Sequence, residues 1–210
     1  MTTRLVAIVP AAGLSRRMGQ PKLLLNLSGR TVIARVIAAL HDTGVARCLV
    51  VVRADDTALR QEVTAAGGEV VLPSTDPADM RQSVEWALRA AGSREPEDES
   101  QATPCDGWIL IPADHPTMNS KVVRELVAAW MTCPSQIAVP VYEGRRGHPT
   151  IFPWNLAEEV FRIPFDQGLN RILRCDPTRV QEVAVSDPRV LDDLDTPEDL
   201  QRLQRELEQG

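Results

Sequence analysis

The sequence predicts an α/β fold in which a mostly parallel sheet carries helices on both faces. Short apolar runs alternate along the chain with segments of helical periodicity, as in repeated βαβ units. The apolar runs are continuous rather than alternating with polar residues, which is typical of parallel strands buried on both faces. The length of 210 residues suits one domain with a substantial core. We therefore expect residues 1–210 to form a single α/β domain.

The first half of the chain is expected to contain strands separated by helices. The run over 5–9 predicts the first strand, and small residues follow it directly. Apolar residues spaced between Val32 and Leu40 predict a helix that ends at Gly44. The further elements expected here are a strand at 49–52, a helix at 58–65, a strand at 70–72 and a helix at 80–91.

An acidic segment, residues 93–106, interrupts this pattern. It is rich in Glu, Asp, Ser and Pro, so it cannot bury apolar area, and we expect a surface insertion rather than a domain boundary. The glycine-closed loop over 142–152 predicts a small antiparallel excursion. The other elements expected after the insertion are strands at 108–111, 137–141 and 180–185, and helices at 120–131, 155–161, 168–174 and from 197 onward.

Composition excludes several classes of function. The formal net charge is -6 and 25% of residues are charged, so the chain lacks the basic surplus that drives binding along nucleic acids. No apolar stretch is long enough to span a bilayer, and the N-terminus is too brief for a signal peptide. The 4 cysteines and 3 histidines show no zinc-like spacing. We expect a cytoplasmic protein with no nucleic-acid or membrane partner.

The segment that follows the first strand, residues 10–22, carries the clearest sign of function. Ala11, Ala12 and Gly13 allow an anion to approach the backbone, whose N–H groups can point at phosphate oxygens. Arg17 and Lys22 add positive charges. The segment fits neither GxxxxGK[ST] nor GxGxxG, which disfavours a P-loop ATPase and a dinucleotide-dependent dehydrogenase. It predicts a loop for a nucleoside triphosphate; the alternative is a glycine turn followed by a solvated basic loop.

The pattern AAGxSxRMGxxK in this segment resembles the nucleotidyltransferases of molybdenum cofactor maturation, the MobA-like family. The resemblance implies a three-layer, Rossmann-like fold of the nucleotide-diphospho-sugar transferase type. It also implies that Arg17 and Lys22 are catalytic and hold the triphosphate. The nucleotide-binding residues it implies are Ala11, Ala12, Gly13, Ser15, Arg17, Lys22 and Ser83. For Ser83 an equally good account is a helical serine that faces solvent.

Two acidic segments suggest a metal site. Asp114 lies between two prolines after the strand at 108–111, and a carboxylate at the carboxyl end of a parallel strand can bind Mg²⁺. Its segment resembles the [GA]DxP metal motif of the family. The segment 191–200 resembles the family's DxDTPEDL, which implies that Asp193 or Asp195 is the second metal ligand. Asp195 or Thr196 can also cap the last helix. The expected ion is Mg²⁺, with Mn²⁺ as a substitute.

The segment 144–149 reads Gly-Arg-Arg-Gly-His-Pro, which resembles a segment of molybdenum cofactor cytidylyltransferases. The resemblance implies that Arg145, Arg146 and His148 bind the phosphate of an acceptor. As a lone loop the same sequence is more often a solvated hairpin.

The resemblance also implies the reaction. The Ala-Ala-Gly form of the first loop accompanies CTP in the family, with Ala12 as the discriminating residue. We therefore expect transfer of CMP from CTP to the terminal phosphate of a molybdopterin-type acceptor, with release of pyrophosphate. A molybdoenzyme or its chaperone would be a further partner. Two alternatives stay open: a transferase that uses GTP or another phosphorylated acceptor, such as a sugar phosphate or a phospholactate-like compound, and a non-catalytic nucleotide-binding or cofactor-delivery protein.

Overall fold

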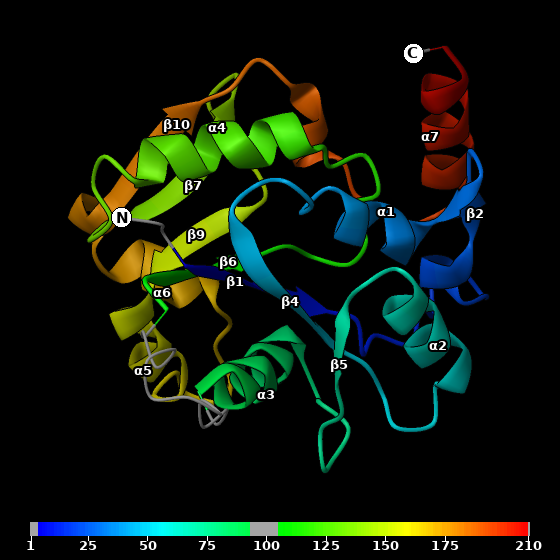
Figure 1. Ribbon diagram of the computed structural model, residues 1–210, viewed down its shortest axis with the longest axis horizontal. Coiled ribbons are helices and arrows are strands. Elements are labelled where there is room, and N and C mark those ends of the chain that lie inside the picture. The colour runs from blue at the N-terminus through cyan, green and yellow to red at the C-terminus, as the bar shows by residue number, and fades with distance from the viewer. Residues whose placement is uncertain (1–3, 93–104, 210) are drawn as a thin grey trace.

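The computed structural model describes residues 4–92 and 105–209, and Figure 1 shows a central sheet with helices packed on both sides of it. The helices are α1 Val32–Ala38, α2 Thr57–Ala65, α3 Met80–Gly92, α4 Ser120–Trp130, α5 Ala157–Val160, α6 Asn170–Cys175 and α7 Pro197–Gln209. The strands are β1 Leu5–Pro10, β2 Asn26–Leu27, β3 Arg30–Thr31, β4 Val45–Val51, β5 Glu69–Val71, β6 Gly107–Leu110, β7 Ile137–Tyr142, β8 Arg145–Arg146, β9 Thr150–Pro153 and β10 Val180–Ala184. Single 3-10 turns occur at Lys22–Leu24, Trp154–Leu156, Pro177–Arg179 and Pro188–Leu191.

The main sheet has the strand order β10-β7-β9-β6-β1-β4-β5, and β8 pairs with β7. β1 lies between β4 and β6 and is parallel to both, and β5 continues the parallel arrangement beyond β4. β9 runs antiparallel to β6 and β7, whereas β10 is parallel to β7. The predicted mostly parallel sheet with a small antiparallel excursion is confirmed.

Successive residues of β1 belong to two separate hydrophobic clusters, which explains its continuous apolar sequence. Leu5, Ala7 and Val9 pack with residues of α1, α2 and α4, while Val6 and Ile8 pack with residues of α3 and α5 on the other face. All five side chains are at most 1% exposed. The loop after Pro10 therefore starts from a strand that is fixed on both faces.

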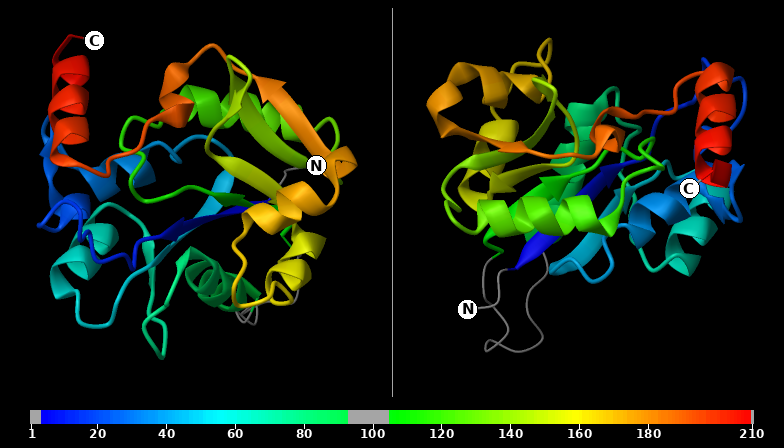
Figure 2. Two further views of the ribbon diagram at one scale, coloured as in Figure 1. Left: turned by 180° about the vertical axis from the view of Figure 1, so that it is seen from behind. Right: turned by 90° about the horizontal axis from the view of Figure 1, so that it is seen from above.

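Several boundaries differ from the sequence prediction. β4 begins at Val45 rather than at residue 49, because it pairs along the whole of β1. α1 ends at Ala38, and Leu40 is buried in the turn beyond it. The β2–β3 hairpin was not predicted, since strands of two residues carry no periodicity; α7 packs beside it (Figure 2). Most of the acidic insertion, residues 93–104, lies outside the described residues. None of the described helices is both long and apolar enough to cross a membrane.

Candidate active site

A cavity of about 390 Å³ opens at the carboxyl ends of β1 and β6. Open parallel sheets bind their ligands at this edge. The cavity is bordered by the loop after β1, the segment before α3, the loop after β6 and the segment before α7. Its lining residues are Pro10, Ala11, Ala12, Gly13, Ser15, Arg16, Arg17, Lys22, Leu23, Pro77, Ala78, Asp79, Met80, Ser83, Pro112, Ala113, Asp114 and Asp195.

The loop after β1 is anchored at both ends and leaves space in its middle. The Ala11 N–H donates to the Val51 carbonyl at 2.9 Å, and Met18 is 6% exposed. Between these anchors Ser15 has a positive φ of 49°. A Cβ atom added to Gly13 would meet nothing within 4 Å. The loop therefore borders the cavity without filling it.

Lys22 lies at the centre of the charged network in the cavity. Its Nζ donates to Asp114 Oδ2 at 2.7 Å, to Asp195 Oδ1 at 2.8 Å and to the Leu194 carbonyl at 2.8 Å. Arg17 reaches the other oxygen of Asp195, at 2.6 Å. A backbone hydrogen bond of 2.9 Å from Leu194 N to the Asp114 carbonyl holds the two acidic segments together. Residues far apart in the sequence thus form one ion-pair cluster.

The pKa values of this cluster follow from its charges. Burial by itself would lower the pKa of Lys22, but the hydrogen bonds and charges of Asp114 and Asp195 outweigh burial and raise it. The hydrogen bond from Lys22, aided by the charges of Lys22 and Arg17, lowers the pKa of Asp195 below its usual range. Both groups are therefore ionised at neutral pH.

The donor set around the Lys22 ammonium is suited to a divalent metal ion. Two carboxylates and a backbone carbonyl converge on one cation, and hard cations such as Mg²⁺ prefer oxygen ligands of these kinds. Mg²⁺ is commonly held by one or two carboxylates together with substrate phosphates. The ammonium would have to leave this position for a metal ion to enter, and bound phosphates offer it an alternative partner. The residues present therefore fit the expected ion.

The two candidates for the second metal ligand have different surroundings. Asp195 lines the cavity and shares the Lys22 ammonium with Asp114, whereas the exposed Asp193 accepts no hydrogen bond from the described residues. Thr196 rather than Asp195 caps α7: its Oγ1 accepts from Asp199 N at 3.2 Å, while the Asp199 carboxylate accepts from Thr196 N at 2.9 Å. Asp195 is thereby left free to face the cavity.

Helix α3 and the residue before it contribute side chains to the cavity that the sequence did not clearly predict. Ser83 is only 3% exposed and lines the cavity, so the alternative of a serine facing solvent is wrong. Asp79, Met80 and Arg16 also line the cavity and were not predicted. Asp79 precedes the helix and accepts from Gln82 N at 2.8 Å. An acidic residue at a helix start indicates a cap, so its sequence gave no separate sign of a site.

The predicted acceptor-binding residues lie outside this cavity. Arg146 is exposed and pairs with Glu182 at 2.8 Å. Arg145 is exposed and has no side-chain partner in the described ranges. His148 packs edge-on against His115, with ring centroids 5.0 Å apart, and its Nδ1 is buried. The structure therefore does not bring these three residues together with the Lys22 cluster around one cavity.

His115, which follows Asp114 in the loop after β6, packs against His148. His115 is 6% exposed, and burial lowers its pKa. Burial, aided by the charge of His115, lowers the pKa of His148 to about 4. The Nδ1 atoms of both rings have no hydrogen-bond partner among the residues described. At neutral pH the pair is uncharged and forms a packed support for the loop that carries Asp114.

Comparison with protein families identifies the class of protein. The model of the MobA-like NTP transferase domain matches residues 7–184, a range that includes the loop after β1 and Asp114. This chain belongs to the MobA-like NTP transferase family. The family resemblance inferred from the motifs is thereby confirmed, and the protein is a nucleotidyltransferase.

Individual relatives agree with this family over nearly the whole chain. The purine catabolism protein PucB of Bacillus subtilis (strain 168) is 25% identical over 213 residues, which cover 97% of each protein. The crystal structure of Rv0371c from Mycobacterium tuberculosis H37Rv has a TM-score of 0.79 and 25% identity, covering 97% of this chain and 99% of that one.

Two further structures share the fold of this MobA-like protein at lower identity. One is a complex of Rv0371c with manganese, with a TM-score of 0.74 and 24% identity over 97% of this chain and 99% of that one. The other is the CMP:2-keto-3-deoxy-manno-octonic acid synthetase complexed with CTP, with a TM-score of 0.71 and 18% identity over 99% of each chain. The predicted fold class is therefore confirmed.

Proposed function

We propose that this protein transfers CMP from CTP to the terminal phosphate of a molybdopterin-type acceptor, releases pyrophosphate and depends on Mg²⁺. The observation that carries the proposal is the convergence of Lys22, Asp114 and Asp195 beside the open loop at Ala11–Gly13. This arrangement offers cations for a triphosphate and carboxylates for a metal ion in a single cavity. A protein that only sensed nucleotides would have no chemical need for both.

In the proposed reaction an oxygen of the acceptor phosphate attacks the α-phosphorus of CTP. The bond between the α-phosphorus and the oxygen that bridges to the β-phosphate breaks, and pyrophosphate leaves with that oxygen. No covalent bond to the protein forms, so catalysis depends on positioning and on stabilising negative charge. Arg17 and Lys22 are the residues assigned to the triphosphate, because both line the cavity.

Asp114 and Asp195 are the residues that would hold Mg²⁺. A bound Mg²⁺ would neutralise charge on the phosphate oxygens at the reacting phosphorus. The manganese complex of a related structure supports a divalent ion in this fold. In the resting protein Lys22 neutralises the same two carboxylates. We assign to Lys22 a move from the carboxylates to the triphosphate as the nucleotide binds.

The choice of CTP rests on the Ala-Ala-Gly form of the loop, which accompanies CTP in the family that it resembles. Ala12 is 9% exposed and lines the cavity, so a change in its size would alter the wall against which the nucleotide packs. A related fold that is described in complex with CTP supports the same choice.

The test has two stages. Thermal shifts with Mg²⁺ and each of CTP, GTP, ATP and UTP should show the largest stabilisation with CTP, since a ligand that binds the folded state raises its stability. Pyrophosphate release should then require both CTP and the molybdopterin acceptor. Preferential stabilisation by GTP would overturn the base assignment. Release with a sugar phosphate, but not with molybdopterin, would overturn the acceptor assignment.

A further inference from the structure

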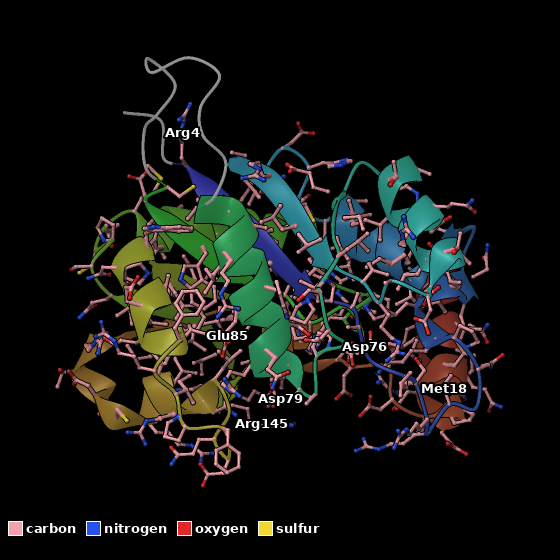
Figure 3. The ribbon with its side chains drawn as sticks, turned by 90° about the horizontal axis from the view of Figure 1, so that it is seen from below. Arg4, Met18, Asp76, Asp79, Glu85 and Arg145 are labelled. Carbon is pink, nitrogen blue, oxygen red and sulfur yellow. The ribbon has the colours of Figure 1, made fainter. Side chains whose placement is uncertain are left out.

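A second cavity lies beside the cavity at the carboxyl ends of β1 and β6, which is called the nucleotide cavity below. The proposed reaction assigns no role to this second cavity. Its volume is about 370 Å³, and its walls are the start of α3, Asp79–Arg81, and the segment between α5 and α6, Phe165–Asn170. Asp79 and Met80 line both cavities. Figure 3 views this side of the molecule, with Asp79 at the start of α3 and Glu85 further along that helix. A molecule in the second cavity would therefore lie next to a nucleotide in the first.

Phe165 presents a large apolar surface at this cavity. Its side chain is 87% exposed, whereas Ile163 and Leu169 on either side of it in sequence are 6% and 9% exposed. A hydrogen bond of 2.9 Å from Gln167 N to the Pro164 carbonyl closes the turn that carries it. The ring is thus held outside the core by a segment that is itself anchored. An exposed aromatic ring in such a position offers a flat face for stacking.

Two polar groups of this cavity are available to a ligand, one exposed and one buried. The Asp166 carboxylate has no hydrogen-bond or ion-pair partner within the described ranges. Arg81 is only 7% exposed and pairs with Glu85, yet its Nε has no partner among the described residues. An unpaired buried donor costs free energy, which a ligand oxygen placed against it would recover. The cavity therefore offers one free acceptor group and one free buried donor.

We infer that the second cavity binds the ring system of the acceptor, a planar nitrogen heterocycle with N–H donors and a carbonyl group. In this assignment Phe165 stacks on the face of the ring, Asp166 accepts hydrogen bonds from its N–H groups, and Arg81 Nε donates to its carbonyl. A sugar phosphate has neither an aromatic ring to stack on Phe165 nor ring N–H groups to donate to Asp166. The inference rests on the proposed transfer to a molybdopterin-type acceptor, whose pterin ring has this chemistry, and it identifies the residues that select that acceptor.

The first test separates acceptor binding from nucleotide binding. Phe165→Ala should raise the KM for the molybdopterin acceptor about tenfold, as expected for loss of one stacking contact. The KM for CTP should stay within about twofold in the same pyrophosphate assay, because Phe165 lies outside the nucleotide cavity. Phe165→Leu keeps the apolar character and should fall between wild type and alanine. Met131→Ala is the matched control, since Met131 is 50% exposed and lines neither cavity.

The second test measures binding without turnover. The fluorescence of 6-hydroxymethylpterin, titrated with the 210-residue chain, should report binding that Phe165→Ala and Asp166→Asn each weaken about tenfold. That result supports the inference even if molybdopterin releases no pyrophosphate, in which case only the proposed reaction fails. The inference would be overturned if Phe165→Ala and Asp166→Asn both kept the wild-type KM for the acceptor and the wild-type affinity for the pterin. The proposed transfer reaction would then still stand. Failure of the wild-type protein to bind the pterin would also overturn it.

Discussion

Two loops that contain glycine and arginine differ in how their glycines are packed. The loop after β1 and the loop at 144–149 both combine glycine with arginine. A Cβ atom on Gly13 would meet nothing within 4 Å, whereas a Cβ atom on Gly147 would lie 2.4 Å from the Val190 carbonyl oxygen. In the first loop glycine leaves space beside a cavity, and in the second it allows two backbone segments to touch. The same residue type thus accompanies open space in one loop and close backbone packing in the other.

The cationic side chains of the two loops also differ in their exposure and in their partners. Lys22 has a side chain that is 14% exposed and contacts two carboxylates from distant segments. Arg146 in β8 has a side chain that is 40% exposed and pairs with Glu182 of β10, and both of these strands pair with β7. A surface pair of the second kind contributes only about 0–1 kcal/mol to stability. We therefore expect changes in the first loop to affect ligand binding and changes in the second loop to affect mainly the stability of the fold.

The largest effect is expected at Asp114, where the first loop meets its acidic partners. Asp114→Ala removes one proposed metal ligand, and a lost metal contact at the transition state costs several kcal/mol. Turnover should fall by at least about 100-fold, at roughly 1.4 kcal/mol per tenfold. Steady-state pyrophosphate release measures the loss, and circular dichroism checks that the variant is folded. Near-normal turnover with Mg²⁺ would show that Asp114 does not hold the metal ion.

The next largest effect should come from Lys22→Met. Loss of charge-assisted hydrogen bonds to the triphosphate should weaken CTP binding by about 10- to 100-fold, because such bonds contribute roughly 1.5–3 kcal/mol. The same change removes the cation that neutralises Asp114 and Asp195, so Mn²⁺ should bind more tightly without nucleotide. Calorimetric titration measures both.

Lys121→Met is the control for this variant, since Lys121 has a 73% exposed side chain and, among the described residues, pairs only with Glu125 on α4. It should change neither affinity. Weaker Mn²⁺ binding in Lys22→Met would contradict the exchange of lysine for a metal ion.

A paired glycine substitution tests the comparison directly. Gly147→Ala should destabilise the protein by about 1–3 kcal/mol, because the added methyl group would overlap the Val190 backbone. Gly13→Ala should change the free energy of unfolding by less than about 1 kcal/mol, since space is free around it. Urea unfolding measures both. Equal losses in the free energy of unfolding for Gly147→Ala and Gly13→Ala would show that the two glycines are packed alike.

A smaller effect should appear in the pH dependence of stability. The folded-state pKa of His148 is lowered to about 4, so the unfolded chain binds more protons between about pH 6.5 and pH 4. The contribution of His148 to the free energy of unfolding should therefore be fully present above about pH 6.5. It should decrease as the pH falls to about 4, by up to about 1.4 kcal/mol per pH unit.

His148→Gln removes the titrating ring and should make the decrease in stability shallower over this pH range. Urea unfolding at several pH values provides the measurement. An unchanged slope in the variant would show that His148 is not protonated preferentially in the unfolded chain.

The sequence alone predicted the central architecture and the family. Buried parallel strands produce continuous apolar runs, and the helices between them show a clear period, so the alternation of β1, α1 and β4 could be inferred locally. The motif after β1 is likewise contiguous and could be recognised without a structure. The β2–β3 hairpin escaped prediction because its strands are too short to show a pattern.

The tertiary structure decided which residues meet. The sequence left Asp193 and Asp195 as equal candidates, and only packing shows that Asp195 shares Lys22 with Asp114. These contacts span more than ninety positions, and no local pattern encodes them. The sequence determined which chemical groups the chain carries, because motifs and periodicity can be recognised from a few neighbouring residues. Side-chain convergence across the sheet edge determined where that chemistry is assembled.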